Sequence, residues 1–216
     1  MYYSTISSNQ RAITRNSACR YLSQNTRIPD HIYGIATEAL QDLPQGLFLE
    51  NRKLHTVCFH PDSQIQTIRK NTFGECKSLS SLILPDSITD IEDRAFYRCR
   101  SLQSVSFPEK LKRIGGQAFY FCNFTSLELP DSLEILEDSA FFKCNNLEYV
   151  HLPQNVRHIG KWAFHGCNRL KVLEIRHDPE YIGDWIINRS AAIRCYRGSR
   201  VDQYCREAGF KVEYLD

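Results

Sequence analysis

The 216-residue sequence lacks the features that mark most enzymes, membrane proteins and nucleic-acid-binding proteins. It has no run of 18 apolar residues, so it predicts no membrane span. It has little excess charge of either sign, because 27 basic residues face 25 acidic ones, and this balance argues against a nucleic-acid partner. The G-x-S-x-G, G-x-x-x-x-G-K-[S/T] and H-E-x-x-H motifs are also missing, and we therefore expect no enzyme activity, no metal and no cofactor.

The N-terminus lacks the apolar core of a secretory signal peptide. We therefore expect a protein that is cytoplasmic, or exported by a route that needs no such signal, or at the cell surface after a leader has been removed. Residues 1–27 are rich in Ser and Arg and contain no acidic residue. This composition predicts an irregular or disordered N-terminal arm.

The sequence does contain an internal repeat. Four near-copies of 22 or 23 residues begin at Pro85, Pro108, Pro130 and Pro153, and the first reads PDSITDIEDRAFYRCRSLQSVSF. A fixed period of this length predicts a solenoid, in which each copy is one coil of chain stacked on the next. We expect an α/β repeat solenoid over residues 28–175, followed by a C-terminal cap over residues 176–216.

Each coil is predicted to contain a short strand with one buried face, as the alternation of Val105 and Phe107 with polar residues indicates. The proline that follows cannot donate to a sheet ladder, so the strand ends and the chain turns. A second apolar set has the spacing of one or two helical or 3₁₀ turns that pack back on the strands, and in the first copy it comprises Ile88, Ile91, Ala95, Phe96 and Cys99.

The string IxxxAFxxCxxLxxVxLPxxL resembles the BspA-like subclass of leucine-rich repeat, and the match runs through Phe73, Phe96, Phe119, Phe141 and Phe164. The resemblance covers residues 28–175. It implies a right-handed coil with a parallel sheet on the concave face and short helical or 3₁₀ turns on the convex side. It also implies an adhesion or protein-binding role, although a repeat of this kind is a scaffold for many partners.

Five of the nine cysteines occupy one repeat position, namely Cys76, Cys99, Cys122, Cys144 and Cys167. Like positions of stacked coils point the same way, which separates their Cβ atoms by about 5 Å, whereas a disulfide needs roughly 3.8 Å. We therefore predict a column of small buried thiols. The other four cysteines show no spacing that pairs them, and they are Cys19, Cys58, Cys195 and Cys205.

The first unit is predicted to be degenerate. An alignment from Ile28 onward puts Ala39 and Leu40 at the Ala–Phe position of the repeat, and the next strand then arrives late, which predicts an insertion near residues 44–51. Leu47 and Phe48 in this segment either fold down onto the core, which is the favoured interpretation, or form an exposed apolar loop that contacts a partner.

The C-terminal end carries helix signals. Ser199 followed by Asp202 predicts a capped helix through Ala208, and Gly209 is placed to end it. The alternation of Phe210, Val212 and Tyr214 then predicts a last short strand.

Two surfaces remain as candidates for binding. Exposed positions of the predicted sheet are small in its N-terminal half and mixed in its C-terminal half, which is typical of an interface. The predicted partner-binding residues are Ile83, Glu128, Tyr149, His151, Val172 and Glu174, and the alternative is an ordinary solvated face. The second surface is a stripe of Tyr97, Tyr120, Phe142 and His165, for which self-stacking is the favoured interpretation and docking the other.

These patterns favour a non-catalytic module that binds a protein through the concave sheet face. One alternative is a structural spacer that associates edge to edge, and another is a secreted, effector-like protein that interacts with a host. The partner is expected to be a protein of unknown identity, and a monomer is favoured.

Overall fold

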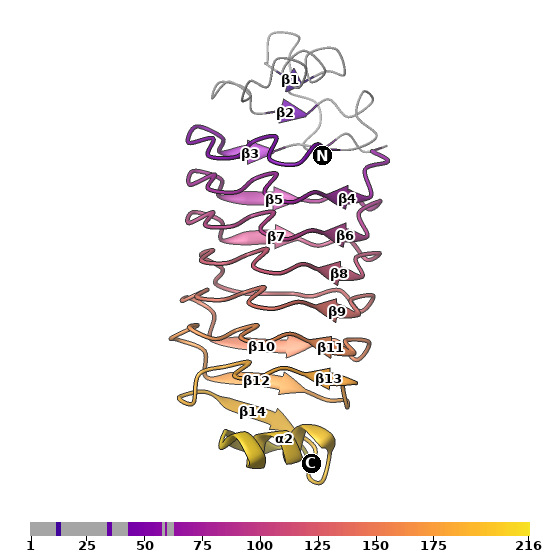
Figure 1. Cartoon of the computed structure of the whole chain (residues 1–216), viewed down its shortest axis with the longest axis vertical. Helices are drawn as coiled ribbons and strands as arrows, with labels where there is room; N and C mark the ends of the chain where they lie inside the picture. Colours follow the sequence, from indigo (N-terminus) through magenta and orange to yellow (C-terminus); the bar gives the residue numbers. More distant parts are fainter. Residues whose placement is uncertain (1–11, 14–33, 36–42, 58, 60–62) are drawn as a thin grey trace.

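The computed structural model describes residues 12–13, 34–35, 43–57, 59 and 63–216. These residues form a column of stacked coils, in which each coil lies against the next along the long axis (Figure 1). The predicted arm over residues 1–27 lies outside the described part of the chain, apart from β1 (Ala12–Ile13), which pairs in parallel with β2 (Gly34–Ile35).

The longer strands form two parallel groups on one side of the column. The N-terminal group has the order β3–β5–β7, and its members are β3 (Thr56–Val57), β5 (Ser81–Ile83) and β7 (Ser104–Ser106). The C-terminal group has the order β10–β12–β14–β15, and its members are β10 (Tyr149–Leu152), β12 (Val172–Ile175), β14 (Ala192–Cys195) and β15 (Lys211–Tyr214). Their outer side is called the long-strand face below, and the predicted parallel sheet is confirmed.

A second parallel sheet runs along the column beside the first (Figure 1). It has six strands of two residues each in the order β13–β11–β9–β8–β6–β4. Its members are β4 (Thr67–Ile68), β6 (Asp90–Ile91), β8 (Arg113–Ile114), β9 (Ile135–Leu136), β11 (His158–Ile159) and β13 (Tyr181–Ile182). The outer side of this sheet, with the turns that flank it, is called the short-strand wall.

The segment around each core phenylalanine consists of tight turns. Ala95 and Tyr97 donate their backbone N–H to the carbonyl three residues earlier, whereas Arg94 and Phe96 donate to the next coil. Arg94 and Arg98 have φ values of 56°, which lie in the left-handed region that a continuous right-handed helix excludes. Hydrogen-bonded turns and a second sheet therefore stand where the apolar spacing predicted helical or 3₁₀ turns.

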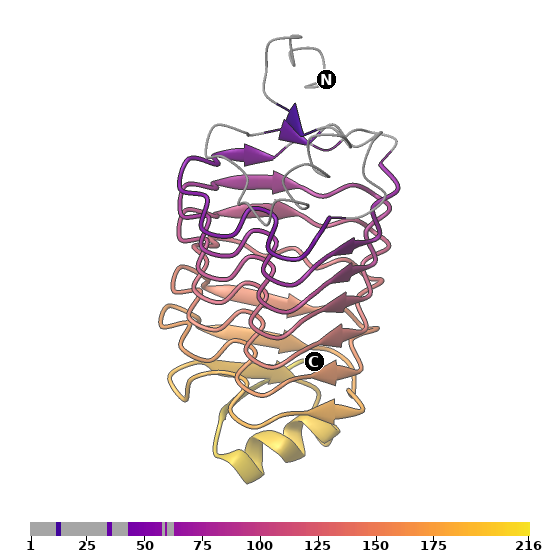
Figure 2. The same cartoon turned by 45° about the horizontal axis from the view of Figure 1, so that its top comes forward.

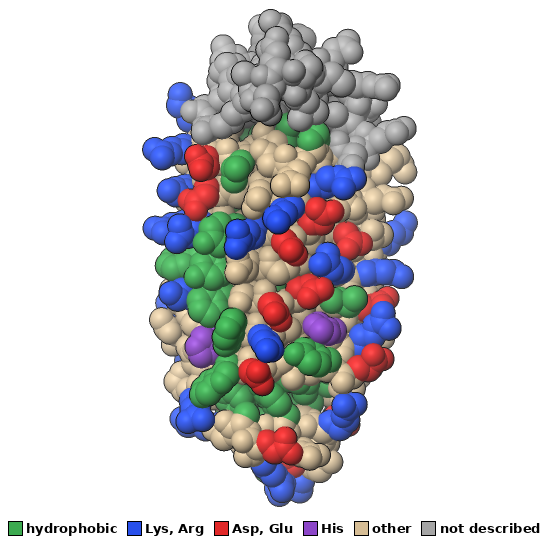
Figure 3. All heavy atoms as spheres, in the orientation of Figure 1, with side chains coloured by type: hydrophobic (Ala, Val, Ile, Leu, Met, Phe, Trp, Pro, Cys, Tyr) green, Lys and Arg blue, Asp and Glu red, His purple; other side chains and the backbone are tan. Residues whose placement is uncertain are grey.

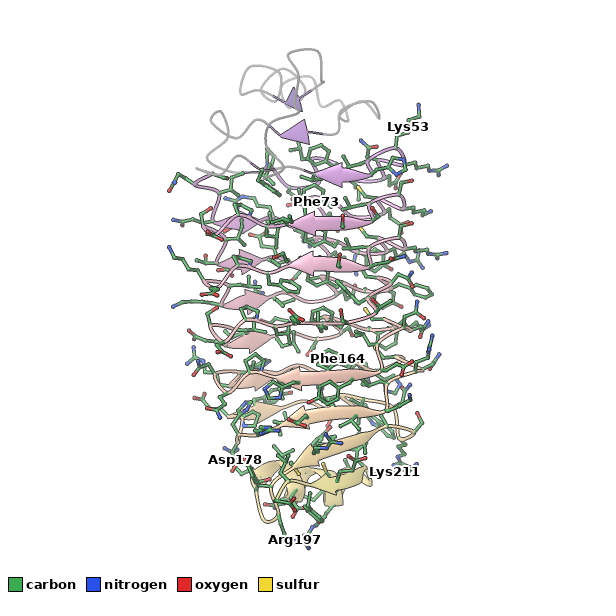
Figure 4. The ribbon with its side chains drawn as sticks, turned by 180° about the vertical axis from the view of Figure 1, so that it is seen from behind. Lys53, Phe73, Phe164, Asp178, Arg197 and Lys211 are labelled. Carbon is green, nitrogen blue, oxygen red and sulfur yellow. The ribbon has the colours of Figure 1, made fainter. Side chains whose placement is uncertain are left out.

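A column of phenylalanine rings fills the interior. The stacked rings have centroid distances of 5.0–5.4 Å, close to the spacing of about 4.8 Å between neighbouring strands. All of these rings are buried, and Figure 4 labels two of them within the stack. The predicted alignment of like residues is confirmed for Phe73, Phe96, Phe119, Phe141 and Phe164.

The cysteine column is also confirmed. The five repeat cysteines are free and buried. Each thiol donates to the carbonyl of a core phenylalanine in the preceding coil at 3.0–3.3 Å, as Cys99 does to Phe73. Burial raises the pKa of the Cys99 thiol well above its ordinary value. The Cys99 thiol therefore stays neutral, and the five buried thiols serve as packing groups.

The coil that begins at Leu43 shows that the alignment predicted for the degenerate first unit was wrong. Leu47 and Phe48 are buried, as the favoured interpretation predicted. Phe48 stacks on Phe73 at 5.1 Å, and its N–H donates to the carbonyl of Thr72. It therefore holds the column position that the alignment gave to Leu40, and residues 44–51 form the turn of this coil in place of the predicted insertion. Ala39 and Leu40 lie outside the described residues.

The C-terminal end is covered by α2 (Arg200–Ala208), which lies across the last coils (Figures 1 and 2). The hydroxyl of Ser199 accepts the N–H of Asp202 at 3.1 Å, and Gly209 ends the helix with a φ of 72°. The predicted helix and both of its end signals are confirmed. Because β13 and β14 extend both sheets beyond residue 175, the segment predicted as a cap begins with a further coil.

Candidate functional site

The C-terminal strand group arranges its outward side chains in two rows across four strands. The first row is mainly apolar and comprises Tyr149, Val172, Ala192 and Lys211. The second row alternates nitrogen-bearing and carboxylate side chains and comprises His151, Glu174, Arg194 and Glu213. Both rows follow from the parallel register, which places equivalent positions of successive coils side by side.

Glu174 is the centre of the second row, although its side chain is only 4% exposed. Its carboxylate accepts hydrogen bonds from Arg176 at 2.6 Å and from Arg194 at 3.1 Å, and His151 Nδ1 lies 3.5 Å away. Burial raises the pKa of Glu174, but the hydrogen bonds from Arg176, Arg194 and Tyr149 outweigh it, so the pKa lies below its ordinary value. The carboxylate is therefore a charged, buried anchor.

Tyr149 and His151 stand above this anchor. Both side chains are exposed, Tyr149 to 47%. Burial of part of the ring and its hydrogen bond to Glu174 raise the pKa of the Tyr149 hydroxyl. The hydroxyl thus stays a proton donor to Glu174. An aromatic ring held at one end and open to solvent along its side is suited to binding, because little rotamer freedom remains to be lost.

The structure brings four of the six predicted residues together, namely Tyr149, His151, Val172 and Glu174. Glu128 is exposed and lies in the coil before β10, where the described residues 125–129 form no strand and the two strand groups separate. Ile83 is 64% exposed but belongs to β5 in the N-terminal group. The sequence did not predict Arg176 and Arg194 as site residues. Arg176 lies just past the end of β12, and Arg194 lies in a coil whose sequence has lost the repeat pattern.

Two shallow hollows flank this strand group near the C-terminal end. The first has a volume of about 550 Å³, and its charged lining includes Glu148, Arg169, Lys171, Lys211 and Glu213. The second has a volume of about 350 Å³ and is lined by Arg176, His177, Tyr196, Arg197 and Ser199, among others. Figure 4 shows Asp178, Arg197 and Lys211 around this end of the column. Both hollows are open and polar, unlike the enclosed apolar sites of small-molecule ligands.

The part of the chain that the structure describes contains neither a candidate metal-ligand group nor a candidate membrane span. No group of three His, Cys, Asp or Glu side chains there is arranged to hold a metal ion. None of the helices in residues 43–57, 59 and 63–216 combines the length and the apolar character of a membrane span. Cys58, one of the four cysteines outside the repeat column, lies outside the described residues.

The predicted aromatic stripe is a continuous stack. Ring centroids are 5.0 Å apart between Tyr97 and Tyr120, 5.1 Å between Tyr120 and Phe142, and 5.9 Å between Phe142 and His165. Trp185 meets His165 edge-on at 6.3 Å and extends the stack by a further coil. The predicted self-stacking is confirmed. The outer side of these turns is called the aromatic wall, and it comprises residues 71–80, 94–103, 117–125, 139–148, 162–171 and 185–191.

Comparison with protein families supports the repeat. Residues 66–194 match the family described as BspA type leucine-rich repeat region, in six copies. A search of curated proteins found no match.

Several solved bacterial proteins share the fold. The T. pallidum leucine-rich repeat protein is 26% identical with a TM-score of 0.60, and the match covers 87% of this chain and 84% of that one. A leucine-rich cell surface protein from Faecalibacterium prausnitzii is 28% identical with a TM-score of 0.55, over 79% of this chain and 43% of that one. A leucine-rich repeat protein from Bacteroides ovatus, at 23% identity and a TM-score of 0.57, shares the fold over 79% of this chain and 47% of its own. The chain thus spans about half the length of the last two proteins.

Proposed function

Because the chain belongs to the BspA-type leucine-rich repeat family, we propose that it is a non-catalytic module that binds a protein partner through the C-terminal strand group of its long-strand face. The family supports an interaction or adhesion role. The observation that carries the proposal is the buried Glu174 carboxylate, which holds the exposed Tyr149 and His151 side chains above it.

A polar cluster of this kind suits recognition. A buried carboxylate needs several donors to offset its loss of hydration, and here Arg176 and Arg194 supply them within one face. The exposed parts of the cluster are an aromatic ring, an imidazole and two guanidinium groups. Tyr and Arg are the residue types that most often carry binding energy at protein interfaces. Among its described outward side chains, the N-terminal group offers mainly Ser at the same positions.

The proposed roles differ among the predicted residues. Tyr149 is the central anchor, and His151 and Val172 extend the contact along their strands. Glu174 positions Tyr149 and His151. It makes little direct contact with the partner itself, because its side chain is buried. Glu128 and Ile83 lie beyond the group and are proposed as peripheral contacts.

The test is affinity capture with a matched pair of variants. Immobilised protein is incubated with extracts of the producing cells and of the cells that they contact, and bound proteins are quantified by mass spectrometry. For any specifically enriched protein, Tyr149→Ser with His151→Ser is expected to reduce capture by about tenfold, which corresponds to about 1.4 kcal/mol of binding free energy. Ser104→Ala with Ser106→Ala, in the N-terminal group, is expected to leave capture unchanged. Equal capture by both variants would remove this face as the binding site.

The alternative of a spacer that associates edge to edge finds less support at the C-terminal end. The last strand, β15, presents Lys211 and Glu213 to solvent. Charged side chains on an edge strand oppose pairing with another sheet. The helix α2 also lies across this end of the stack (Figure 2).

A further inference from the structure

The aromatic wall holds a large surplus of positive charge. It carries eight basic residues, namely Lys77, Arg94, Arg98, Arg100, Lys143, Arg169, Lys171 and Arg189, and only two acidic ones, Glu75 and Glu148. The whole chain has a net charge of only +2. The rest of the molecule must therefore be net negative, and positive charge is concentrated on this one wall.

The two acidic residues of the wall are already paired. Glu75 lies 3.4 Å from Lys77 and 3.3 Å from Arg98. Glu148 is bound by Arg169 at 2.6 Å and by Lys171 at 2.7 Å, and these two partners lower its pKa. Each carboxylate is thus shared by two cations, and neither is available to neutralise the others.

The four remaining cations contact aromatic rings. Their charged groups lie 5.6 Å from the ring centre of Tyr97 for Arg94, 5.0 Å from Phe121 for Arg100, 5.5 Å from Phe142 for Lys143 and 4.8 Å from Trp185 for Arg189. Among the residues that the structure describes, no carboxylate forms an ion pair with any of the four. Three are arginines, whose planar guanidinium groups suit carboxylates.

Most rings of the wall have a face covered, either by a stacked neighbour or by a cation. Tyr97, Tyr120 and Phe142 are half-buried, and they stack on one another at 5.0 and 5.1 Å. Binding of single-stranded nucleic acid relies on ring faces that are free to stack with bases, so this stack is poorly suited to it. Ring edges carry partial positive charge, which adds to the field of the cations. Figure 3 shows the hydrophobic band along one margin of the molecule, with Lys and Arg side chains beside it.

We propose that the aromatic wall is a second docking surface, which binds an acidic, extended segment of a partner protein. Arg100, Lys143 and Arg189 lie in alternate coils, so successive cations are about 10 Å apart along the column for a strand spacing of about 4.8 Å. A chain in the extended polyproline II conformation rises about 3.1 Å per residue with three residues per turn, so it covers this distance in about three residues and brings every third side chain to the same side. The wall therefore fits a segment with a carboxylate at every third position and one apolar residue in each interval. This role is independent of the long-strand face.

The test uses a labelled peptide in which the unit Glu-Leu-Ser is repeated four times, with binding followed by fluorescence anisotropy. The triple variant Arg100→Gln, Lys143→Gln, Arg189→Gln is expected to weaken binding by about tenfold or more, because it removes three exposed charge pairs with the peptide. The control variant Lys112→Gln, Arg157→Gln, Lys161→Gln makes the same change in net charge on the short-strand wall and is expected to change the affinity less than about threefold.

Further measurements test which ligand binds and which surface binds it. A peptide of the unit Lys-Leu-Ser is expected not to bind, and Tyr149→Ser with His151→Ser is expected to leave binding of the acidic peptide unchanged, which separates this surface from the long-strand face. Equal losses in the two triple variants would show unspecific attraction and overturn the proposal. So would the absence of peptide binding, or tighter binding of oligothymidine or phosphatidylserine vesicles through the same three cations.

Discussion

The short-strand wall and the aromatic wall are built from alternate segments of the same coils, and they handle charge in opposite ways. On the short-strand wall the sign alternates: residues 85–93 and 130–138 each contain four acidic residues and no basic one, whereas residues 108–116 and 153–161 each have two more basic residues than acidic ones. Figure 3 shows the two signs interleaved over the short strands. On the aromatic wall the basic residues outnumber the acidic ones eight to two.

Alternation lets each coil bind both of its neighbours. Arg113 lies 3.8 Å from Asp90 and 3.7 Å from Asp93 in the coil before, and 3.3 Å from Glu137 in the coil after. Lys112 and Arg157 meet Glu134 from opposite sides in the same manner. Charge on the short-strand wall is thus paired within the stack, whereas four of the eight cations of the aromatic wall have no carboxylate partner among the described residues.

The largest effect is expected from a substitution at Gly160, where two coils approach closely on the short-strand wall. A Cβ atom at Gly160 would lie 2.4 Å from the backbone N of Asp138 and 2.4 Å from the backbone C of Glu137. Both atoms belong to the neighbouring coil and have no freedom to move aside. Gly160→Ala is therefore expected to lower the free energy of unfolding by about 3 kcal/mol, measured by urea denaturation.

A nearby glycine of the same wall provides the control. A Cβ at Gly116 would meet its nearest atom, the Asp138 carbonyl oxygen, at 3.5 Å, which is an ordinary contact. Gly116→Ala is expected to stay within about 0.5 kcal/mol of the wild-type protein. Similar losses in both variants would mean that the close approach of coils is not what glycine serves here.

The second effect contrasts the walls directly by reversing one charge on each. Arg113→Glu replaces a cation by a fourth carboxylate beside Asp90, Asp93 and Glu137, and we expect a loss of about 1–2 kcal/mol in the free energy of unfolding. Lys143→Glu makes the same change in net charge beside Phe121 and Phe142, and we expect a change within about 0.5 kcal/mol. Thermal or urea unfolding measures both, and a larger loss for Lys143→Glu would reverse the comparison.

Much of the fold follows from the repeat, because stacking places like residues on like. The phenylalanine and cysteine columns and the capped helix at Ser199 were all predicted correctly. The short-strand sheet was not, because the apolar spacing from Ile88 to Cys99 suits a helical turn as well as a two-residue strand followed by tight turns. Arg94 and Arg98 adopt left-handed conformations, which are usually marked by Gly or Asn. The sequence has neither at these two positions, so it did not indicate the turns.

The exposure of the candidate binding residues was predicted correctly for some of them and wrongly for one. Alternation along the strands placed Tyr149 and His151 on the outer face, where the structure has them. The same alternation predicted an exposed Glu174, and its side chain is buried. Its burial depends on Arg176, just past the end of its own strand, and on Arg194 in the next coil. The repeat pattern fades after Ile175, so nothing in the sequence aligned Arg194 with Glu174.

The smallest expected effect concerns Glu174 on the long-strand face. It tests whether Arg176 and Arg194 stabilise this carboxylate, as the ion pairs of the short-strand wall stabilise theirs. The pKa of Glu174 is lowered in the folded protein, so the unfolded chain, with an ordinary value of about 4.3, binds the proton more readily. The stabilisation by Glu174 is therefore complete above that ordinary value and is lost as the pH falls through the lower, folded-state value. The stability difference between the wild-type protein and Glu174→Gln, from urea unfolding at neutral pH and at about pH 3, is expected to shrink in acid.

The matched control for this pH dependence is Glu128→Gln. Glu128 is exposed and has no ion pair among the described residues, so its stability difference from the wild-type protein is expected to stay near zero at both pH values. If the difference for Glu174→Gln were equally flat, Arg176 and Arg194 would not be stabilising the carboxylate. The carboxylate on the long-strand face would then gain no stability from its neighbours. Stabilising ion pairs between coils would be confined to the short-strand wall.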